Sequence, residues 1–288
     1  MELRHFHEKD YEAVCDFLIA LNRRERTHIH WNWARFEWMY EHPEFDKSLR
    51  SSIGLWWEAG RVVGAAIYDM YFGEAFCGTL PEYAALYPEI LAYAHRELRD
   101  GDGLAVAICD GSAGEVAAAR ALGFAPAEQP GETVMRLPLD RLPSLHLPEG
   151  YSAAELDPAQ EACEFQWLLW QGFDHGTDRS VFQREDPVVV RRRPHLDPRL
   201  SLAAVAPDGK KAAYCCLWFR PDTDYAYVEP VCAVPAQRGR GVAGGLLAEA
   251  LRRARALGAR EAFVLSDLSF YETLGFEKAL HFSFYRKP

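Results

Sequence analysis

The chain contains two approximate copies of one sequence pattern, and this repeat constrains its fold more than any other feature. Three short segments recur in the same order at an offset of about 150 residues: EAVCDFL at 12–18 with EACEF at 161–165, GRVVGAA at 60–66 with GKKAA at 209–213, and ALGF at 121–124 with TLGF at 273–276. A length of 288 residues suits two ordinary domains. The sequence therefore predicts two tandem copies of one fold.

A proline-rich segment separates the two copies. Residues 138–150 contain Pro138, Pro143 and Pro148, which disfavour a helix and suit an extended connector. We therefore expect a first domain at residues 1–142 and a second at residues 147–288.

The second copy shows the clearer alternation of strand and helix patterns. Its periodicity predicts helices at 158–171, 242–257 and 268–274, and strands at 151–156, 201–206, 212–219, 225–234, 262–265 and 280–286. Gly258 is placed to end the long helix, whereas residues 181–191 fit no single pattern. This order predicts an α/β fold in which each domain has a mixed, mostly antiparallel sheet flanked by helices.

Composition excludes several classes of protein. The net charge of −10 argues against nucleic acid as a partner, and no apolar run approaches the length of a membrane span. The start of the chain lacks a signal-peptide pattern, so we expect a cytoplasmic protein without a membrane partner. The seven cysteines form no CxxC pair or cluster with histidines, so neither a disulfide framework nor a metal site is expected. The run 191–193 of three arginines is expected on a solvated face, and the oligomeric state stays open.

A glycine-rich loop, VPAQRGRGVAGG at residues 234–245, lies between a predicted strand and a predicted helix. Backbone amides at a helix start, unobstructed by side chains, form a concave anion site that the helix dipole strengthens. Arg238 and Arg240 add positive charge to this loop. The loop therefore predicts a site for a phosphate or pyrophosphate.

One reading of this loop is the dinucleotide-binding pattern GxGxxG. Gly239, Gly241 and Gly244 satisfy it, and Glu261 lies near the expected position of a ribose-binding acid. However, that fold places the loop after its first strand and needs several further strand–helix units. In this half of the chain three predicted strands precede the one that leads into the loop, and only a short segment follows the loop. The order of elements therefore argues against a dinucleotide fold.

The same residues resemble the GCN5-related N-acetyltransferase (GNAT) superfamily. The coenzyme A loop of that family reads Gln/Arg-x-x-Gly-x-Gly/Ala, which RGRGVA at residues 238–243 satisfies at every fixed position. A second family motif, an aromatic residue and tyrosine followed by Gly-Phe, is matched by FYETLGF at residues 270–276. The resemblance covers residues 147–288 well and the first half in outline only.

This resemblance implies an acyltransferase that uses acetyl-CoA as co-substrate and moves the acetyl group to a primary amine of a small molecule or peptide. The pantetheine arm is expected along the end of the strand at residues 231–234, including Cys232, Ala233 and Val234. An amide near Cys232 or Ala233 is expected to polarise the thioester carbonyl. The pyrophosphate is expected on the amides of the loop: Arg238, Gly239, Arg240, Gly241, Val242 and Ala243.

Two side chains are the expected catalytic groups. Tyr271 occupies the tyrosine position of the family and is expected to protonate the departing thiolate. Glu229 is the candidate base, although it lies one residue away from the expected position, and only a bulge near Pro230 would turn it to the site. Cys232 as an acyl-carrying nucleophile is a weaker hypothesis, because no histidine is paired with it. Asp174 is a candidate to meet the ammonium of the acceptor.

The first copy lacks these features. Its counterpart of the loop, around residues 76–88, carries Glu82 in place of arginines and Pro88 where a helix is expected, and its late motif at residues 118–124 has no tyrosine. We therefore expect no coenzyme A at residues 1–140. The alternative function is a non-catalytic coenzyme A-binding or regulatory module, which release of the thiol from acetyl-CoA in the presence of amines would distinguish.

Overall fold

The computed structural model describes residues 1–185, 188 and 193–288, so Arg191 and Arg192 of the predicted solvated run lie outside the described residues. The chain forms two compact units. Unit 1 comprises Met1–Val134, Leu265–Asp267 and Lys278–Pro288, and unit 2 comprises Met135–Val264 and Leu268–Glu277. None of the described helices has the length and apolar character needed to cross a membrane.

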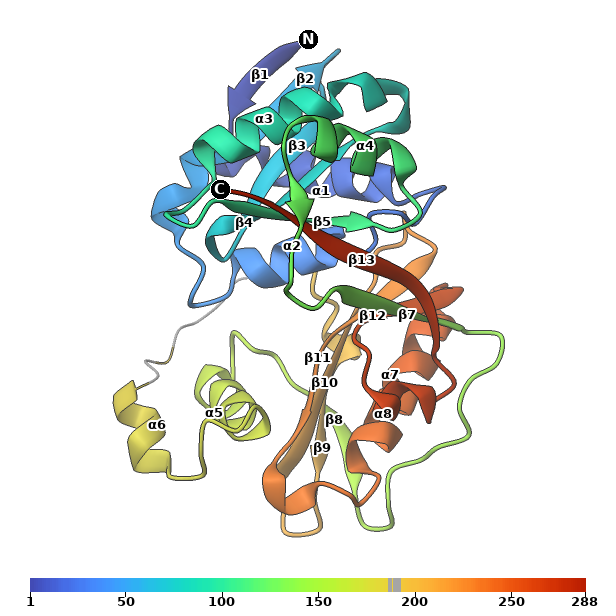
Figure 1. The fold of residues 1–288 in the computed structure, drawn as a ribbon. Helices are drawn as coiled ribbons and strands as arrows, with labels where there is room; N and C mark the ends of the chain where they lie inside the picture. The colour runs from blue at the N-terminus through green and yellow to red at the C-terminus, as the bar shows by residue number, and fades with distance from the viewer. Residues whose placement is uncertain (186–187, 189–192) are drawn as a thin grey trace. The chain divides into compact units, whose positions relative to one another are not determined.

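Unit 1 has one sheet with helices packed against it (Figure 1). The strand order is β1-β2-β3-β4-β5-β13, with β6 beside β13. The strands are β1 (Glu2–His5), β2 (Gly54–Glu58), β3 (Arg61–Asp69), β4 (Tyr71–Thr79), β5 (Leu104–Cys109), β6 (Ala125–Pro126) and β13 (Glu277–Lys287). The helices are α1 (Tyr11–Leu21), α2 (Trp33–Tyr40), α3 (Tyr87–Glu97) and α4 (Ala113–Ala121), with short 3₁₀ turns at Glu8–Asp10, Lys47–Ser52 and Pro81–Leu86.

Unit 2 repeats this plan with the strand order β7-β12-β11-β10-β9-β8. Its strands are β7 (Glu132–Pro138), β8 (Ser152–Glu155), β9 (Ser201–Val205), β10 (Lys211–Trp218), β11 (Tyr225–Ala233) and β12 (Glu261–Leu265). Its helices are α5 (Ala162–Gly172), α6 (Arg179–Glu185), α7 (Val242–Leu257) and α8 (Ser269–Glu272), with 3₁₀ turns at Pro198–Leu200 and Pro235–Gln237. The predicted α/β fold with a mixed sheet is confirmed in both units.

The two sheets share one pairing pattern, and their last strands come from the opposite half of the chain. Strands β1 to β4 are antiparallel and β4 pairs with β5 in parallel. Strands β8 to β11 and the pair β11–β12 repeat this arrangement. However, β7 follows α4 of the first copy yet lies beside β12, and β13 follows α8 of the second copy yet pairs with β5. The compact units therefore do not follow a single cut of the chain between residues 142 and 147.

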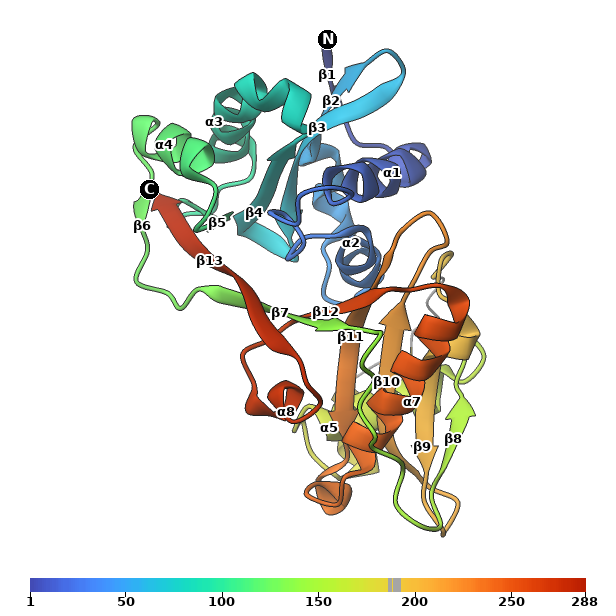
Figure 2. The ribbon, with the colours of Figure 1, turned by 90° about the vertical axis from the view of Figure 1, so that its right-hand side faces the viewer.

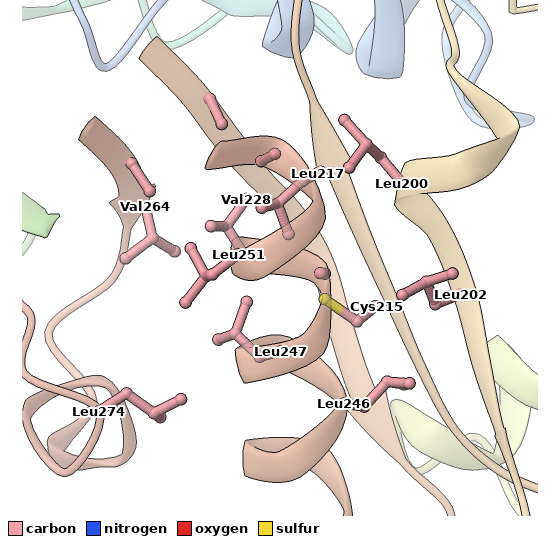
Figure 3. Packing of buried hydrophobic residues seen from close by; sticks show 14 of the residues in the cluster. Leu200, Leu202, Cys215, Leu217, Val228, Leu246, Leu247, Leu251, Val264 and Leu274 are labelled. Atoms are coloured by element: carbon pink, nitrogen blue, oxygen red, sulfur yellow. The ribbon is translucent and has the colours of Figure 1, made fainter. Parts of the chain in front are cut away.

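Helix α7 forms the centre of the unit 2 core, and its bounds are those the sequence predicts. It begins after Gly241 and ends before Gly258, and both glycines have left-handed backbone angles that other residues adopt only with strain. The helix lies across β9, β10 and β11 (Figure 2). Its apolar face, with Leu246, Leu247 and Leu251, packs on side chains of those strands (Figure 3). This packing fixes the start of α7 at one end of the sheet.

Helix α5 covers the opposite face of the unit 2 sheet. Its Phe165 packs edge-on against Tyr214 of β10, whereas Ala213 and Cys215, the neighbours of Tyr214, face α7. Arg193 is 8% exposed, and its guanidinium lies over the rings of Phe165 and Trp218. The expectation that this arginine is solvated is therefore wrong, because aromatic faces on the inner side of the unit hold the cation.

The first copy has a helix at Pro88, where one was expected. Helix α3 runs from Tyr87 to Glu97, and Pro88 lies in its first turn. Proline is tolerated there because the amides of the first turn have no acceptor within the helix. Pro88 therefore removes one amide donor from the start of α3, but it does not end the helix.

A buried group of carboxylates in unit 1 shares one cation. Arg35 pairs with Asp69 at 2.8 Å and with Glu132 at 3.5 Å. Burial, followed by the charges of Asp69 and Glu132, raises the pKa of Glu74 to about 7. Glu74 therefore takes up a proton on folding between its ordinary pKa of about 4.5 and about 7.

The free energy of unfolding of the wild type is expected to fall as the pH rises through this window. We expect Glu74→Gln to abolish this fall. A raised carboxyl pKa means that the folded state binds more protons, so its contribution is present at low pH and is lost by pH 7 to 8. After allowance for solvent screening, the variant should gain about 1–2 kcal/mol over wild type at pH 8 and almost nothing at pH 5. Urea unfolding at both values measures this difference. Glu82→Gln, which alters an exposed ion pair with Arg61, is the control; a pH-independent gain would contradict the prediction.

Candidate functional site

Strand β11 has an open edge near its C-terminal end. It pairs with β10 as far as Ala233, whereas its parallel pairing with β12 extends, within the described residues, from Tyr225 to Tyr227. The two strands therefore diverge beyond Tyr227. Backbone amides and carbonyls on the β12 side of residues 228–233 are left without a ladder partner from β12.

The orientation of these backbone groups follows from the pairing with β10. The amide of Val234 donates to Ala212 O at 3.0 Å, and Cys232 lies opposite Tyr214. Because alternate residues of an antiparallel strand point their polar backbone groups to opposite sides, Cys232 and Val234 face β10. Val231 and Ala233 consequently present their amides to the open edge, so the open amide beside the predicted thioester is that of Ala233 and not that of Cys232.

The glycine-rich loop lies directly after this strand, at the start of α7. Gly239 and Gly241 have φ angles of 71° and 78°, and a Cβ atom built on either one meets no atom within 4 Å. Gly241 is the N-cap of α7, and no side chain caps the helix. The amides of the first turn have no acceptor within the helix, so the loop presents open donors at the positive end of the helix dipole.

The two arginines of the loop have different surroundings. The guanidinium of Arg238 pairs with Asp174 at 2.9 Å and donates to Gly172 O at 2.9 Å and Ala233 O at 3.1 Å. The amide of Arg238 also donates to Pro235 O at 3.3 Å. Arg240 is exposed and makes no ion pair or side-chain hydrogen bond within the described part of the chain. Arg240 is therefore the available cation of the loop, whereas Arg238 already contacts the carboxylate of Asp174.

Tyr271 lies on α8, on the same face of the sheet as α7. Its ring packs edge-on against Phe270 and Phe276, with centroids 5.0 and 5.6 Å away. Burial, together with Cys215 and the charge of Glu229, raises the pKa of the phenol. The side chain therefore keeps its proton at neutral pH and is able to donate it.

Glu229 lies in the irregular part of β11. The pairing of β10 with β11 shifts between Cys215 and Leu217, whose partners are Val231 and Val228. Two steps along β10 thus correspond to three along β11, which is a bulge at Glu229 and Pro230. The bulge that the sequence required for Glu229 is present. The half-buried carboxylate is near enough to Tyr271 to contribute to the raised pKa of that phenol.

The thiol of Cys232 points to α5. A Cβ atom on Gly172 would lie 2.4 Å from Cys232 Sγ, so the two segments are in close contact. Burial raises the pKa of the Cys232 thiol to about 12. Since the thiolate is the nucleophile, this cysteine has little reactive form at neutral pH.

We expect iodoacetamide to leave Cys232 unmodified in the folded protein near neutral pH. Cys163 is half-buried, whereas the other six cysteines are buried, so Cys163 should be alkylated first. Peptide mass spectrometry after a short exposure measures this order, and labelling in urea, where every cysteine should react, is the control. Rapid modification of native Cys232, or an acetyl group recovered on it, would revive the nucleophile hypothesis.

A cavity of about 690 Å³ lies beside the start of the loop, between α5 and the turn that joins β9 to β10. Its three cations are each paired with a carboxylate: Arg179 with Glu164, Lys210 with Asp208 and Lys211 with Glu161, at 2.5 to 3.1 Å. These pairs leave the described lining without a free cation for a phosphate group. Sequence reasoning missed this cavity because separate segments of the chain form it.

Comparisons with known proteins agree with this geometry. Residues 160–276 match the model of the Acetyltransferase (GNAT) family, whereas no curated protein matches the chain significantly. Three solved structures illustrate the likeness of the fold. A GCN5-related N-acetyltransferase from Sphaerobacter thermophilus has 18% identity and a TM-score of 0.56 over 99% of this chain and 95% of its own. A tandem GNAT protein from the clavulanic acid biosynthesis pathway has 18% identity and a TM-score of 0.60, covering 99% and 98%. A GNAT-family acetyltransferase from Colwellia psychrerythraea has 12% identity and a TM-score of 0.60, with both chains fully covered.

The match to the family model includes the strand β11, the loop and the tyrosine motif. The two solved structures with a TM-score of 0.60 share the fold over nearly the whole chain, and one of them is a tandem protein. Residues 160–276 thus match the acetyltransferase (GNAT) family model, and the chain has the fold of solved GNAT proteins, one of which is a tandem protein.

Proposed function

We propose that unit 2 is an N-acetyltransferase that moves an acetyl group from acetyl-CoA to a primary amine of a small molecule or peptide. The observation that carries this proposal is the uncapped start of α7 next to the open edge of β11. One feature supplies donors for a pyrophosphate and the other supplies donors for an extended amide-containing arm. An acyl-CoA uses both sets of donors, because its pyrophosphate suits the start of α7 and its amide-containing pantetheine arm suits the neighbouring edge of β11.

In this proposal the backbone holds the donor. The amides of residues 239–243 and the side chain of Arg240 bind the pyrophosphate. The open edge of β11 at Val231 and Ala233 pairs with the pantetheine arm, and the amide of Ala233 donates to the thioester carbonyl. Arg238 acts through position, because its bonds to Asp174, Gly172 and Ala233 hold the end of α5 against the loop.

Two side chains supply the proton transfers. Glu229 accepts a proton from the ammonium form of the acceptor, directly or through water, which frees the nitrogen lone pair. The nitrogen attacks the thioester carbon and a C–N bond forms, after which the nitrogen releases its second proton to solvent and the C–S bond breaks. Tyr271 donates its proton to the departing thiolate and regains one from solvent, so that the products are an amide and free coenzyme A.

The experiment measures binding and chemistry separately on the full chain. Calorimetry with acetyl-CoA should give a one-to-one complex, and a thiol assay with a panel of primary amines should detect free coenzyme A whose release depends on the amine. Saturable binding without release for any amine would favour the alternative of a non-catalytic coenzyme A-binding or regulatory module. Absence of binding by a folded protein would overturn both readings.

A further inference from the structure

Unit 1 contains a cavity of about 450 Å³ at the place that corresponds to the proposed acyl-CoA cleft of unit 2. The cavity is lined by Thr79 at the end of β4, by Tyr87 and Pro88 at the start of α3 and by Ser112 and Glu115 at the start of α4. Strands β4 and β5 pair in parallel at Glu74 and Ala105, and both strands continue beyond these two residues. Unit 1 therefore keeps a cleft between diverging strands.

The charge of this cleft is opposite to that of the glycine loop in unit 2. Its charged or titratable lining residues are Glu25, His28 and Glu115 together with Tyr87, and the lining includes neither lysine nor arginine. Pro88 also removes an amide donor from the first turn of α3. A phosphate group would meet carboxylates here, so the cleft is unsuited to acyl-CoA.

A partly buried contact between His28 and Glu115 lies in the wall of the cleft. His28 Nε2 is 3.0 Å from Glu115 Oε1, with side-chain exposures of 8% and 20%. The other ring nitrogen of His28 lies 3.2 Å from Thr27 Oγ1. After burial, the charge of Glu115 is the next cause of the raised pKa values of Cys77 and Tyr87. The Cys77 thiol and the Tyr87 phenol thus both lie in a negative field that comes from Glu115.

The remaining walls are apolar. Leu21, Pro81, Ala84, Ala85 and Ala118 line the cavity between the charged groups, and Glu25 is exposed at its rim. An apolar pocket of this volume with a few polar groups at fixed positions is typical of sites for small organic ligands.

We propose that the cleft of unit 1 binds a small organic cation, an alkylammonium or arylalkylammonium compound. Its ammonium donates to the carboxylate of Glu115 beside His28, because a carboxylate accepts more than one hydrogen bond. It also pairs with Glu25 at the rim, and its apolar body lies against Leu21, Pro81 and Ala84. The partly buried Glu115 gives the stronger attraction, because a carboxylate away from water is less screened than an exposed one. This site is separate from the proposed acetyl transfer and does not depend on it.

The test compares three probes that share an indole ring and differ in charge: tryptamine (cation), tryptophol (neutral) and indole-3-acetate (anion). Calorimetry with the full chain, without acetyl-CoA, should show tryptamine binding at least tenfold more tightly than tryptophol and no binding of indole-3-acetate. Equal affinities for tryptamine and tryptophol, or no binding of tryptamine at millimolar concentration, would overturn the proposal.

Variants locate the site. Glu115→Gln should weaken tryptamine at least tenfold and tryptophol less than twofold, and the exposed Glu25→Gln should weaken tryptamine about threefold without affecting the fold. Glu97→Gln, which alters an exposed pair with Arg96 outside the cleft, should leave every affinity unchanged. Tryptamine binding that survives both Glu115→Gln and Glu25→Gln would place the cation elsewhere and reject the assignment. Circular dichroism melting shows whether each variant is folded.

Discussion

Gly241→Glu is expected to weaken acetyl-CoA binding at least 100-fold while the protein remains folded. The substitution places a carboxylate at the N-cap of α7, where the proposal puts the pyrophosphate, so charge repulsion and occupied space act together. Space for the side chain exists, since an added Cβ atom meets nothing within 4 Å. The left-handed backbone angle of 78° costs about 1–2 kcal/mol, and a carboxylate at a helix start partly offsets this cost. Calorimetry with acetyl-CoA measures the loss.

Gly60→Glu is the matched control for this strain. Gly60 has a φ angle of 80° and open space around its Cβ position, but it lies in the turn between β2 and β3 of unit 1. The Gly60→Glu variant should lose about as much thermal stability as Gly241→Glu, and its affinity for acetyl-CoA should equal that of the wild type. If Gly241→Glu and Gly60→Glu bind acetyl-CoA equally well, the pyrophosphate does not lie on this loop.

Arg240→Ala is a cleaner test of the loop charge than Arg238→Ala. Arg238 holds Asp174 and two backbone carbonyls, so its removal would disturb the contact between α5 and the loop as well as any ligand. The sequence presents the two arginines as equivalent neighbours. The structure separates them because α5, which is distant in the sequence, supplies the partners of only one.

Local sequence determines some features of this fold well. The helix 242–257 could be predicted to the residue, because its apolar face, its starting glycine and its ending glycine are all local signals. A bulge near Pro230 was also considered from the sequence, because a role for Glu229 at the site depends on one, and the structure has a bulge at Glu229 and Pro230. Pro88 does not prevent a helix at this place, because a proline is tolerated in the first turn.

Other features depend on pairing between distant segments and were beyond local patterns. The sequence indicates a strand at residues 280–286, within β13, and no strand at β7. Because hydrophobic alternation does not specify a neighbour, the exchange of β7 and β13 between the two units could not be inferred. The position of Arg193 depends in the same way on rings from α5 and β10. The cavity of unit 1 was missed because three segments that are distant in the sequence line it, although Glu82 and Pro88 already indicated that its chemistry differs from that of unit 2.

Tyr271→Phe is expected to lower kcat for acetyl transfer about 100-fold or more and to change the Kd of acetyl-CoA less than twofold. The variant keeps the ring, and with it the packing against Phe270 and Phe276, but removes the proton donor for the thiolate, for which general-acid catalysis contributes about 100-fold or more. Because burial holds the pKa of Tyr271 above its ordinary value, the wild-type rate should not fall on the alkaline side below about pH 10. Single-turnover kinetics across pH, with calorimetry for the affinity, measure both quantities.

Tyr285→Phe is the control, because Tyr285 is buried to a similar degree, 7% against 8% exposed, but lies on β13 of unit 1. It should leave kcat and affinity unchanged. Full activity of Tyr271→Phe would mean that water protonates the thiolate and that the tyrosine has a packing role. A loss of acetyl-CoA affinity equal to the loss of rate would instead assign the hydroxyl to binding of the donor, so the ratio of the two effects decides which step the phenol serves.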